Sequence, residues 1–352
     1  MSNASDAAIR EDCLAAIAPH VPVLRELAGR RLAITGGSGF LGSWLAETVT
    51  ALNDEHKMDI RLDVLAYRAS AWAADYEHLG GRPDVSTRDQ DVRSSFEFAS
   101  DVSFVVHAAG IPDGRVHSSD PLRVFQTCVT GIGNVLDAAS KLSNMAGLLN
   151  VSSGLIYGGQ AGPGGFTEDT FGGLDIGQVS HVYAESKRAA ESLCAAYRSQ
   201  FRIPIVTTRP FTFVGPYQKL NRPWALNNFL RDALGGREIR VHGDGETRRS
   251  YMYGSDAACW VLVALVKGTP GRAYNLGSKG VMSIRQLAEE ISLQVERRPA
   301  VLFRTLPAAQ LRQSDFFPST DRAMQELKVQ ETVGISSALA KTIAWHKRQA
   351  SC

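Results

Sequence analysis

The sequence predicts an α/β fold in which a doubly wound parallel sheet is joined to a smaller C-terminal α/β lobe. Short β-type runs alternate with longer amphipathic segments, and strands separated by helices form right-handed crossovers in a parallel sheet. The first run ends in a glycine-rich turn that opens a helical segment. With 352 residues and 44% hydrophobic content, the chain can bury one large core and a smaller one.

Six apolar runs are predicted to form the strands of the sheet. They are Leu32–Thr35, Leu62–Ala66, Val102–His107, Leu148–Ser152, Ile205–Arg209 and Ala273–Leu276. A seventh apolar run, Ala257–Val266, is about ten residues long and too short to span a membrane, so we expect a buried helix there.

Two stretches interrupt the alternation of strands and helices. Gly158–Gln178 is rich in glycine, and Phe211–Arg249 is rich in Gly, Pro, Asn and Arg. The first residues carry a weak helical pattern that is broken at Pro19 and Pro22. The expected division is an N-terminal helical extension (1–29), a large domain (30–210, with 252–276 returning to it) and a substrate-binding lobe (211–251 and 277–352).

Composition narrows the class of partner. The 38 Lys and Arg residues nearly balance the 36 Asp and Glu residues and are scattered, so the basic footprint of a nucleic-acid-binding protein is missing. The five cysteines form no Cys-x-x-Cys pair, which argues against a disulfide framework and a metal site and favours the cytoplasm. The chain has no apolar stretch long enough for a membrane helix, and its charged start is unlike a secretory signal. We expect a small-molecule substrate.

The turn after the first strand has the residues that a dinucleotide requires. Glycines at Gly36, Gly39 and Gly42 allow a tight turn, close approach of a pyrophosphate and packing of the following helix on the sheet. The helix that follows, expected over Ser43–Leu52, presents free N–H groups to the anion. This arrangement predicts a Rossmann nucleotide-binding domain.

The end of the second predicted strand bears on the choice of cofactor. NAD-binding Rossmann folds normally place an acidic residue there to hold the ribose hydroxyls. Here the strand runs into Tyr67 and Arg68, and the nearby Asp63 lies inside the strand. Arg68 stands where a 2′-phosphate would lie, so the cofactor is NAD or NADP, with NADP favoured.

A Tyr-x-x-x-Lys pair begins a long helical pattern. Spacing of four places Tyr183 and Lys187 on one helical face, where the ammonium could lower the pKa of the phenol toward neutrality and make it a general base. Ser152 and Ser153 follow a predicted strand at its C-terminal end, where open α/β sheets bind their ligands.

Several motifs together resemble the extended short-chain dehydrogenase/reductase family, in its NAD(P)-dependent nucleotide-sugar epimerase and dehydratase branch. The resemblance covers most of residues 30–295. The matching segments are Thr35–Gly42, Asp91-Val92, His107–Gly110, Val151–Gly158, Tyr183 with Lys187, Arg209–Phe211 through Gly215–Tyr217, and Gly243–Gly245 leading into Arg249–Tyr253 and Asp256.

The resemblance implies a role for each matching residue. Tyr183 is the acid or base at the substrate hydroxyl, Lys187 supports it and holds the nicotinamide ribose, and Ser153 bonds the reacting oxygen while hydride moves at a sugar carbon, usually C4. Substrate would also meet Gly154, Thr212 and Arg249, whose guanidinium suits a diphosphate. The expected cofactor contacts are Gly36, Ser38, Gly39, Phe40, Leu41, Gly42, Arg68, Asp91, Val92, Ala108, Ala109, Gly110, Tyr183, Lys187 and Pro210.

The sequence departs from the family at the catalytic serine. The 4,6-dehydratases carry an Asp-Glu pair where this chain has Gly154 and Leu155, and decarboxylases acting on UDP-glucuronate carry a glutamate at the second position. Neither Gly154 nor Leu155 can transfer a proton. Cys128 and Thr212 also stand where the family often has asparagine, so hydrogen bonding near the sugar must differ.

These observations favour a nucleotide-sugar epimerase. The alternatives are an NADPH-dependent reductase of nucleotide 4-keto sugars, favoured by Arg68, and a dehydratase with non-standard acid and base residues. A reductase for a lipophilic alcohol is disfavoured by Arg249, and a dinucleotide sensor without activity would not need Tyr183 and Lys187. Family members usually form homodimers through two helices, which here would be Asp120–Lys141 and Tyr183–Gln200.

Overall fold

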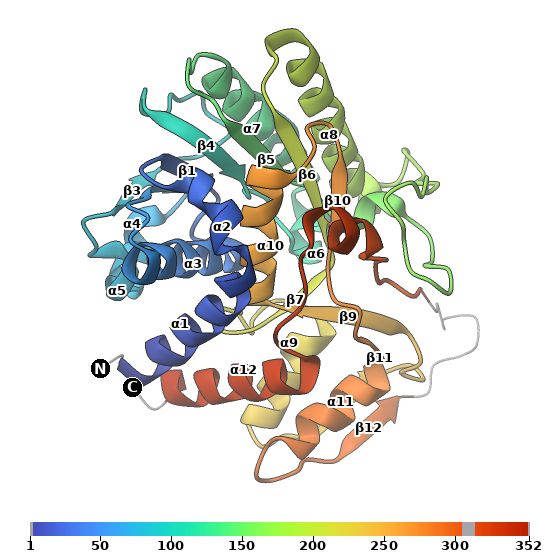
Figure 1. Ribbon diagram of the computed structural model, residues 1–352. Coiled ribbons are helices and arrows are strands. Elements are labelled where there is room, and N and C mark those ends of the chain that lie inside the picture. Colours follow the sequence, from blue (N-terminus) through green and yellow to red (C-terminus); the bar gives the residue numbers. More distant parts are fainter. Residues whose placement is uncertain (1–2, 305–313, 351–352) are drawn as a thin grey trace.

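The computed structural model describes residues 3–304 and 314–350 and is built around one parallel sheet (Figure 1). Its seven strands lie in the order β10-β6-β5-β4-β1-β2-β3. The order reverses between β1 and β4, so the C-terminal ends of these neighbours border the crevice where doubly wound sheets bind ligands. The strands are β1 Arg31–Thr35, β2 Arg61–Ala66, β3 Val85–Asp89, β4 Val102–His107, β5 Gly147–Val151, β6 Ile205–Pro210 and β10 Ala273–Leu276.

The predicted α/β class and the six predicted strands are confirmed, but β3 was missed. Its sequence, Val-Ser-Thr-Arg-Asp, is mostly polar, and only Val85 is buried. β3 pairs with β2 alone and forms one edge of the sheet. Because an edge strand needs fewer apolar residues than a central one, its sequence gives a weak strand pattern.

Helices cover both faces of the sheet (Figure 1). On one face, α7 (Pro121–Ser140) and α8 (Val182–Phe201) pack on the strands through a core that includes Val105 and Leu148. On the other face lie α3 (Phe40–His56) and α10 (Gly254–Lys267), and α10 is the predicted buried helix. Three shorter helices complete this part: α4 (Ala69–Asp75), α5 (Glu77–Gly80) and α6 (Gly114–Ser119).

A smaller lobe lies beyond the C-terminal ends of the sheet strands (Figure 1). It contains a three-stranded sheet in the order β11-β9-β7 and a two-stranded sheet of β12 and β8. β6 leads almost directly into β7, β9 leads into α10, and β10 leads back to β11, so the chain crosses between the large sheet and the lobe at these three places. The elements are β7 Thr212–Val214, β8 Ile239–His242, β9 Arg248–Tyr253, β11 Val281–Ser283, β12 Val301–Arg304, α9 Ala225–Leu234, α11 Ile284–Leu293 and α12 Ile335–Ala350.

The N-terminal segment forms α1 (Asn3–Ile17) and the short α2 (Val21–Leu24), with a 3₁₀ turn after each. Pro19 and Pro22 stand in the first turns of the helical pieces that they begin, where proline needs no N–H partner. The segment packs on α3 and α10 and is joined to the lobe through Asp12. Asp12 accepts a hydrogen bond from the Tyr253 hydroxyl (2.9 Å) and pairs with Lys341 of α12 (2.9 Å). Within the described residues, no helix has the length and apolar character to cross a bilayer.

Candidate active site

A cavity of about 1150 Å³ runs along the C-terminal ends of the sheet strands and into the lobe. Its walls come from the glycine turn, the ends of β2, β4, β5 and β6, the start of α8, and the lobe. Most of the residues predicted to form the site line it. They are Gly36, Ser38, Gly39, Phe40, Leu41, Gly42, Asp91, Val92, Ala108, Ala109, Gly110, Ser153, Tyr183, Lys187, Pro210, Thr212 and Arg249.

The glycine turn leaves no room for side chains at two of its positions. Gly36 has a φ of +73°, and a Cβ there would lie 2.5 Å from the backbone nitrogen of Ala109. A Cβ on Gly42 would lie 2.2 Å from the Gly37 carbonyl oxygen. Helix α3 begins at Phe40, three residues earlier than predicted, so its first N–H groups belong to the cavity wall. This backbone cradle at a helix N-terminus fits the pyrophosphate of a dinucleotide.

The structure does not bring Arg68 to the cavity. Arg68 is the residue before α4, and its side chain makes no cap hydrogen bond. Hydrogen bonds from Ser70, with a smaller contribution from the charge of Arg68, lower the pKa of the Asp89 carboxyl. Tyr67, one residue earlier, lines the cavity instead. The backbone turns into α4 directly after β2, and this turn separates the two neighbouring side chains.

Gly154 also lies outside the cavity lining. It begins the 3₁₀ turn Gly154–Tyr157, and a Cβ there would lie 2.8 Å from the Phe211 ring. The structure therefore requires glycine at this position for packing against Phe211. Its neighbour Leu155 lines the cavity, with 46% of its surface exposed.

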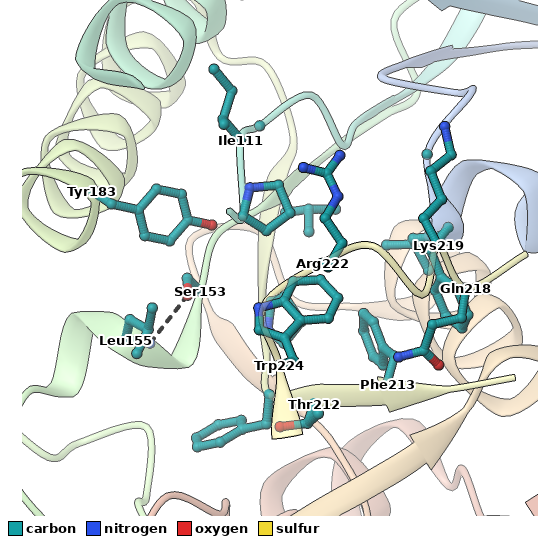
Figure 2. A pocket seen from close by; sticks show the side chains of 18 of the residues that line it. Ile111, Ser153, Leu155, Tyr183, Thr212, Phe213, Gln218, Lys219, Arg222 and Trp224 are labelled. Atoms are coloured by element: carbon teal, nitrogen blue, oxygen red, sulfur yellow. Dashed lines mark hydrogen bonds between the residues drawn. The ribbon is translucent and has the colours of Figure 1, made fainter. Parts of the chain in front are cut away.

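The predicted catalytic residues converge from two elements. Tyr183 and Lys187 lie in the first turns of α8 and are buried, and Ser153 lies directly after β5. Figure 2 shows Tyr183 and Ser153 on one side of the pocket, with Trp224 and Thr212 of the lobe across from them. The Ser153 hydroxyl accepts a hydrogen bond from the Leu155 N–H (3.1 Å).

The expected effect of Lys187 on the pKa of Tyr183 is not what the structure shows. Burial raises the pKa of Tyr183, and a hydrogen bond with Ser153 lowers it only in part. The Lys187 ammonium donates to the Val151 carbonyl oxygen (2.8 Å). The lysine therefore holds the end of β5, and in this geometry the cost of burying a phenolate outweighs its influence on the tyrosine.

A buried histidine contacts the end of β1, directly before the glycine turn. His107, the last residue of β4, forms a hydrogen bond with the Thr35 hydroxyl at the end of β1 (2.7 Å). Burial, with a smaller contribution from Lys187, lowers the pKa of His107 to about 3. The imidazole is thus neutral near pH 7 and joins the two strands that border the switch point.

Three further residues belong to the site but were missed in the sequence. His117 on α6 stacks on Tyr183, with ring centroids 4.5 Å apart and an angle of 13° between the planes. Arg222 and Trp224, from the loop before α9, line the cavity. These three residues come from elements other than α8, which carries Tyr183, so no sequence motif contains them. The only signal for His117 was its position after the end of a predicted strand, where open α/β sheets bind their ligands.

The lobe end of the cavity is rich in aromatic residues and contains Arg249. Its guanidinium lies over the Phe316 ring (5.7 Å) and donates to the Ser314 carbonyl oxygen (2.5 Å). Burial lowers the pKa of Arg249 below its ordinary value. Phe213 of β7 stacks on Phe40 of the glycine turn (5.7 Å), so the lobe touches the cofactor cradle directly.

Carboxylates are scarce in this cavity. Asp91 is the one carboxylate among the described lining residues, and its pKa is lowered first of all by a hydrogen bond from Arg93 (2.5 Å). Asp91 lies beyond the glycine turn from the catalytic trio, at the place expected for the adenine. Residues 305–313 contain no Asp or Glu.

A parallel sheet with this switch point, a glycine cradle and a Ser, Tyr and Lys trio define an enzyme of the extended short-chain dehydrogenase/reductase type. Residues 32–277 match the family model described as the NAD dependent epimerase/dehydratase family. The chain belongs to this family, as the motifs predicted.

Similar proteins carry out several reactions. UDP-glucuronic acid decarboxylase 1 of Xenopus tropicalis is 28% identical over 332 residues, which cover 94% of this chain and 75% of the relative. Human dTDP-D-glucose 4,6-dehydratase is 29% identical over 273 residues, covering 74% and 73%. The Bordetella bronchiseptica enzyme WbmF, solved with NAD+ and UDP, has a TM-score of 0.76 at 21% identity and covers 93% of this chain and 95% of its own. Structures named epimerases share the fold as well.

Proposed function

We propose that this protein is an NAD-dependent nucleotide-sugar epimerase that acts by hydride transfer at a sugar carbinol, C4 by family resemblance. The observation that carries the proposal is the lack of any carboxylate among the described cavity residues around Ser153 and Tyr183. A hydroxyl, a phenol and an ammonium could support reversible oxidation of an alcohol by a bound nicotinamide cofactor, but they include no side chain suited to eliminate water from the sugar.

Tyr183 and Ser153 have different roles at the sugar carbon. Tyr183 takes the proton of the sugar hydroxyl as that carbon is oxidised and returns it when the carbon is reduced. Ser153 donates a hydrogen bond to the same oxygen in its keto form. When bound, NAD supplies the site that accepts the hydride and gives it back. Return of the hydride to the opposite face of the keto sugar completes the inversion, and no external oxidant or reductant is needed.

Leu155 argues against the reactions of the two curated relatives. The family's dehydratases and decarboxylases have a glutamate at this position by resemblance. Here an aliphatic side chain that lines the cavity occupies it. Without that acid, a keto intermediate in this site can only accept hydride again.

NAD is favoured over NADP by the position of Arg68. The prediction of NADP depended on this guanidinium reaching a 2′-phosphate, and Arg68 lies outside the cavity lining. The reductase alternative depended on the same residue and loses its support. The similar structures solved with NAD+, such as WbmF, agree with this preference.

Cations near the lobe suit a nucleoside diphosphate carrier. Arg249 and Lys219 line the cavity, and Arg249 matches the family position that grips the diphosphate. The aromatic wall formed by Phe213 and Trp224 provides apolar surface for a sugar ring.

The test is to incubate purified protein with UDP- and dTDP-hexoses that carry deuterium at C4, and to follow the sugars by NMR. We expect the 4-epimer to appear with deuterium retained at C4, without added cofactor, and Tyr183→Phe to be inactive. A 4-keto-6-deoxy product, release of carbon dioxide, or turnover only with added NADPH would overturn the proposal. Mass spectrometry of the nucleotide released on denaturation identifies the bound cofactor.

A further inference from the structure

We propose that His117 is a positioning residue that fixes the phenol ring of Tyr183 by stacking on it. The inference rests on the proposed function for the role of Tyr183 as the proton-transferring group. His117 and Tyr183 come from different helices, α6 and α8, and their rings are nearly parallel at 4.5 Å. Neither residue type nor sequence spacing predicts this pair.

The imidazole is itself held in place. His117 Nε2 lies 2.6 Å from the Ile111 carbonyl oxygen. A carbonyl oxygen can only accept, so Nε2 carries the hydrogen and the ring plane is set by this bond. Ile111 lines the cavity directly after the Ala108–Gly110 strip that faces the expected cofactor. The bond therefore connects the cofactor wall to the ring that stacks on the tyrosine.

Packing restrains Tyr183 from α7 as well. Val124 and Cys128 form a small buried cluster with the tyrosine, and Ile111 and Val116 pack at its border. A phenol that rotated by a few tens of degrees would move its oxygen away from Ser153 and the sugar hydroxyl. A stack of flat rings resists this rotation more than aliphatic contacts do, because its attraction depends on the angle between the planes.

The matched variants are His117→Phe, which keeps a flat ring, and His117→Leu, which keeps apolar bulk without one. We expect the leucine variant to lose about tenfold in kcat, as the loss of a stack worth ~1.4 kcal/mol implies. The phenylalanine variant keeps the stack but not the Nε2 hydrogen bond to Ile111, and we expect it to stay within about threefold of the parent protein. KM and the Kd for NAD should change less than about twofold in both, since neither substrate nor cofactor is touched. His56→Leu, at the far end of α3, is the control.

A second readout does not depend on turnover. In protein with ring-labelled tyrosine, Tyr183→Phe assigns the Tyr183 resonance by NMR. We expect this resonance to stay sharp and shifted upfield in His117→Phe, whose ring also lies over the phenol, and to move downfield or broaden in His117→Leu. If the two variants show these resonances but the parent protein epimerises no sugar, the proposed function fails while the positioning role stands.

Two results would overturn the positioning role. Equal loss of kcat in both variants would mean that His117 acts through its Nε2 hydrogen, which both variants lack, and not through ring stacking. Unchanged kcat and resonance in His117→Leu would mean that the stack is incidental. Thermal melting of each variant separates either result from loss of the fold.

Discussion

At the scale of single residues, Tyr183 is enclosed by groups that keep it neutral. Burial raises the pKa of its phenol, the adjacent Cys128 thiol acts in the same direction, and only Ser153 opposes them. In the proposed epimerase, a neutral tyrosine could donate a proton to a keto sugar. To accept one, it would need positive charge nearby, which an oxidised nicotinamide cofactor would supply when bound.

Replacing Tyr183 by phenylalanine removes the proton-transferring oxygen and little else. We expect turnover to fall by about a thousandfold, in the range typical of a lost general acid or base, with NAD affinity nearly unchanged. Steady-state kinetics and calorimetric titration with NAD measure the two quantities. Turnover that survived the substitution would show that another group moves the proton.

His107 should make the fold sensitive to acid. Its pKa is about 3 in the folded protein, against an ordinary value of 6.5, so between these values the unfolded chain binds a proton that the folded protein does not. Stability is therefore complete above pH 6.5 and declines as the pH falls, by roughly 2 kcal/mol at about pH 5. Urea unfolding measures the free energy of unfolding at about pH 8 and about pH 5. The difference between the two pH values should be smaller by this amount in His107→Asn than in the parent protein. An identical difference in both proteins would exclude His107 as the source.

The sequence predicted those site residues that local spacing or a strand end marks. Tyr183 and Lys187 lie one helical turn apart, and Ser153 follows an apolar strand, so all three could be found without coordinates. Arg68 was misplaced because residues on either side of a turn point in different directions, which a sequence pattern does not record. His117 meets Tyr183 only through tertiary packing.

At the scale of elements, α6 connects the two walls of the cavity. Asp113, which caps α6, is buried and accepts hydrogen bonds from Arg115 of the same helix (2.7 Å) and from Arg222 of the lobe loop (2.8 Å). The Arg115 side chain also donates to the Asn221 carbonyl oxygen. These bonds, led by that from Arg115, hold the pKa of Asp113 well below its usual range. The loop that carries Trp224 is thereby tied to the cofactor side.

Asp113→Asn should loosen this loop. The amide is uncharged and can accept fewer hydrogen bonds, so we expect KM for the nucleotide sugar to rise by about tenfold, while the Kd for NAD stays the same. Kinetics over a range of sugar concentrations measure the first and titration the second. Asp101→Asn, which removes a carboxylate paired with Arg31 and Arg61 outside the cavity lining, is the control and should leave both constants unchanged. A rise in both constants would place the defect in the fold instead.

The glycine turn leaves no room for a side chain at Gly42. In Gly42→Ala, the added methyl would lie 2.2 Å from the Gly37 carbonyl oxygen, so the turn must shift away from its pyrophosphate-binding geometry. We expect NAD affinity to fall by at least about a hundredfold, since one displaced turn changes several anion contacts together. Gly334→Ala, where the added methyl meets nothing within 4 Å, is the matched control for calorimetric titration.

Strand and helix prediction succeeded where burial was complete. The central strands and α10 are apolar along their length, and their boundaries agree with the sequence pattern within a few residues. The pattern failed at β3, a polar edge strand, and it gave no order for the strands of the lobe. Those short strands are set by contacts between segments far apart in the chain, such as β7 with β9 and β8 with β12.

At the scale of the whole molecule, α7 presents apolar side chains to solvent. Leu122 and Phe125, three residues apart, are 65% and 43% exposed. The family resemblance predicts pairing of α7 and α8 with the same helices of a second copy, and this face would then be covered. We expect sedimentation equilibrium to give the mass of two chains for the parent protein and the mass of a single chain for Phe125→Glu. A monomeric parent protein would contradict this prediction.

The scarcity of carboxylates around Ser153 has a consequence for the direction of flux. In the proposed epimerase, the site exchanges only hydride and proton with its sugar, and no step releases water or carbon dioxide, so nothing makes the reaction one-way. Two hexoses that differ at one hydroxyl have nearly equal free energies, and the cofactor ends each cycle as it began. Such a catalyst interconverts its two sugars toward a ratio near unity, and net conversion in the cell is then set by whichever enzyme consumes one of them.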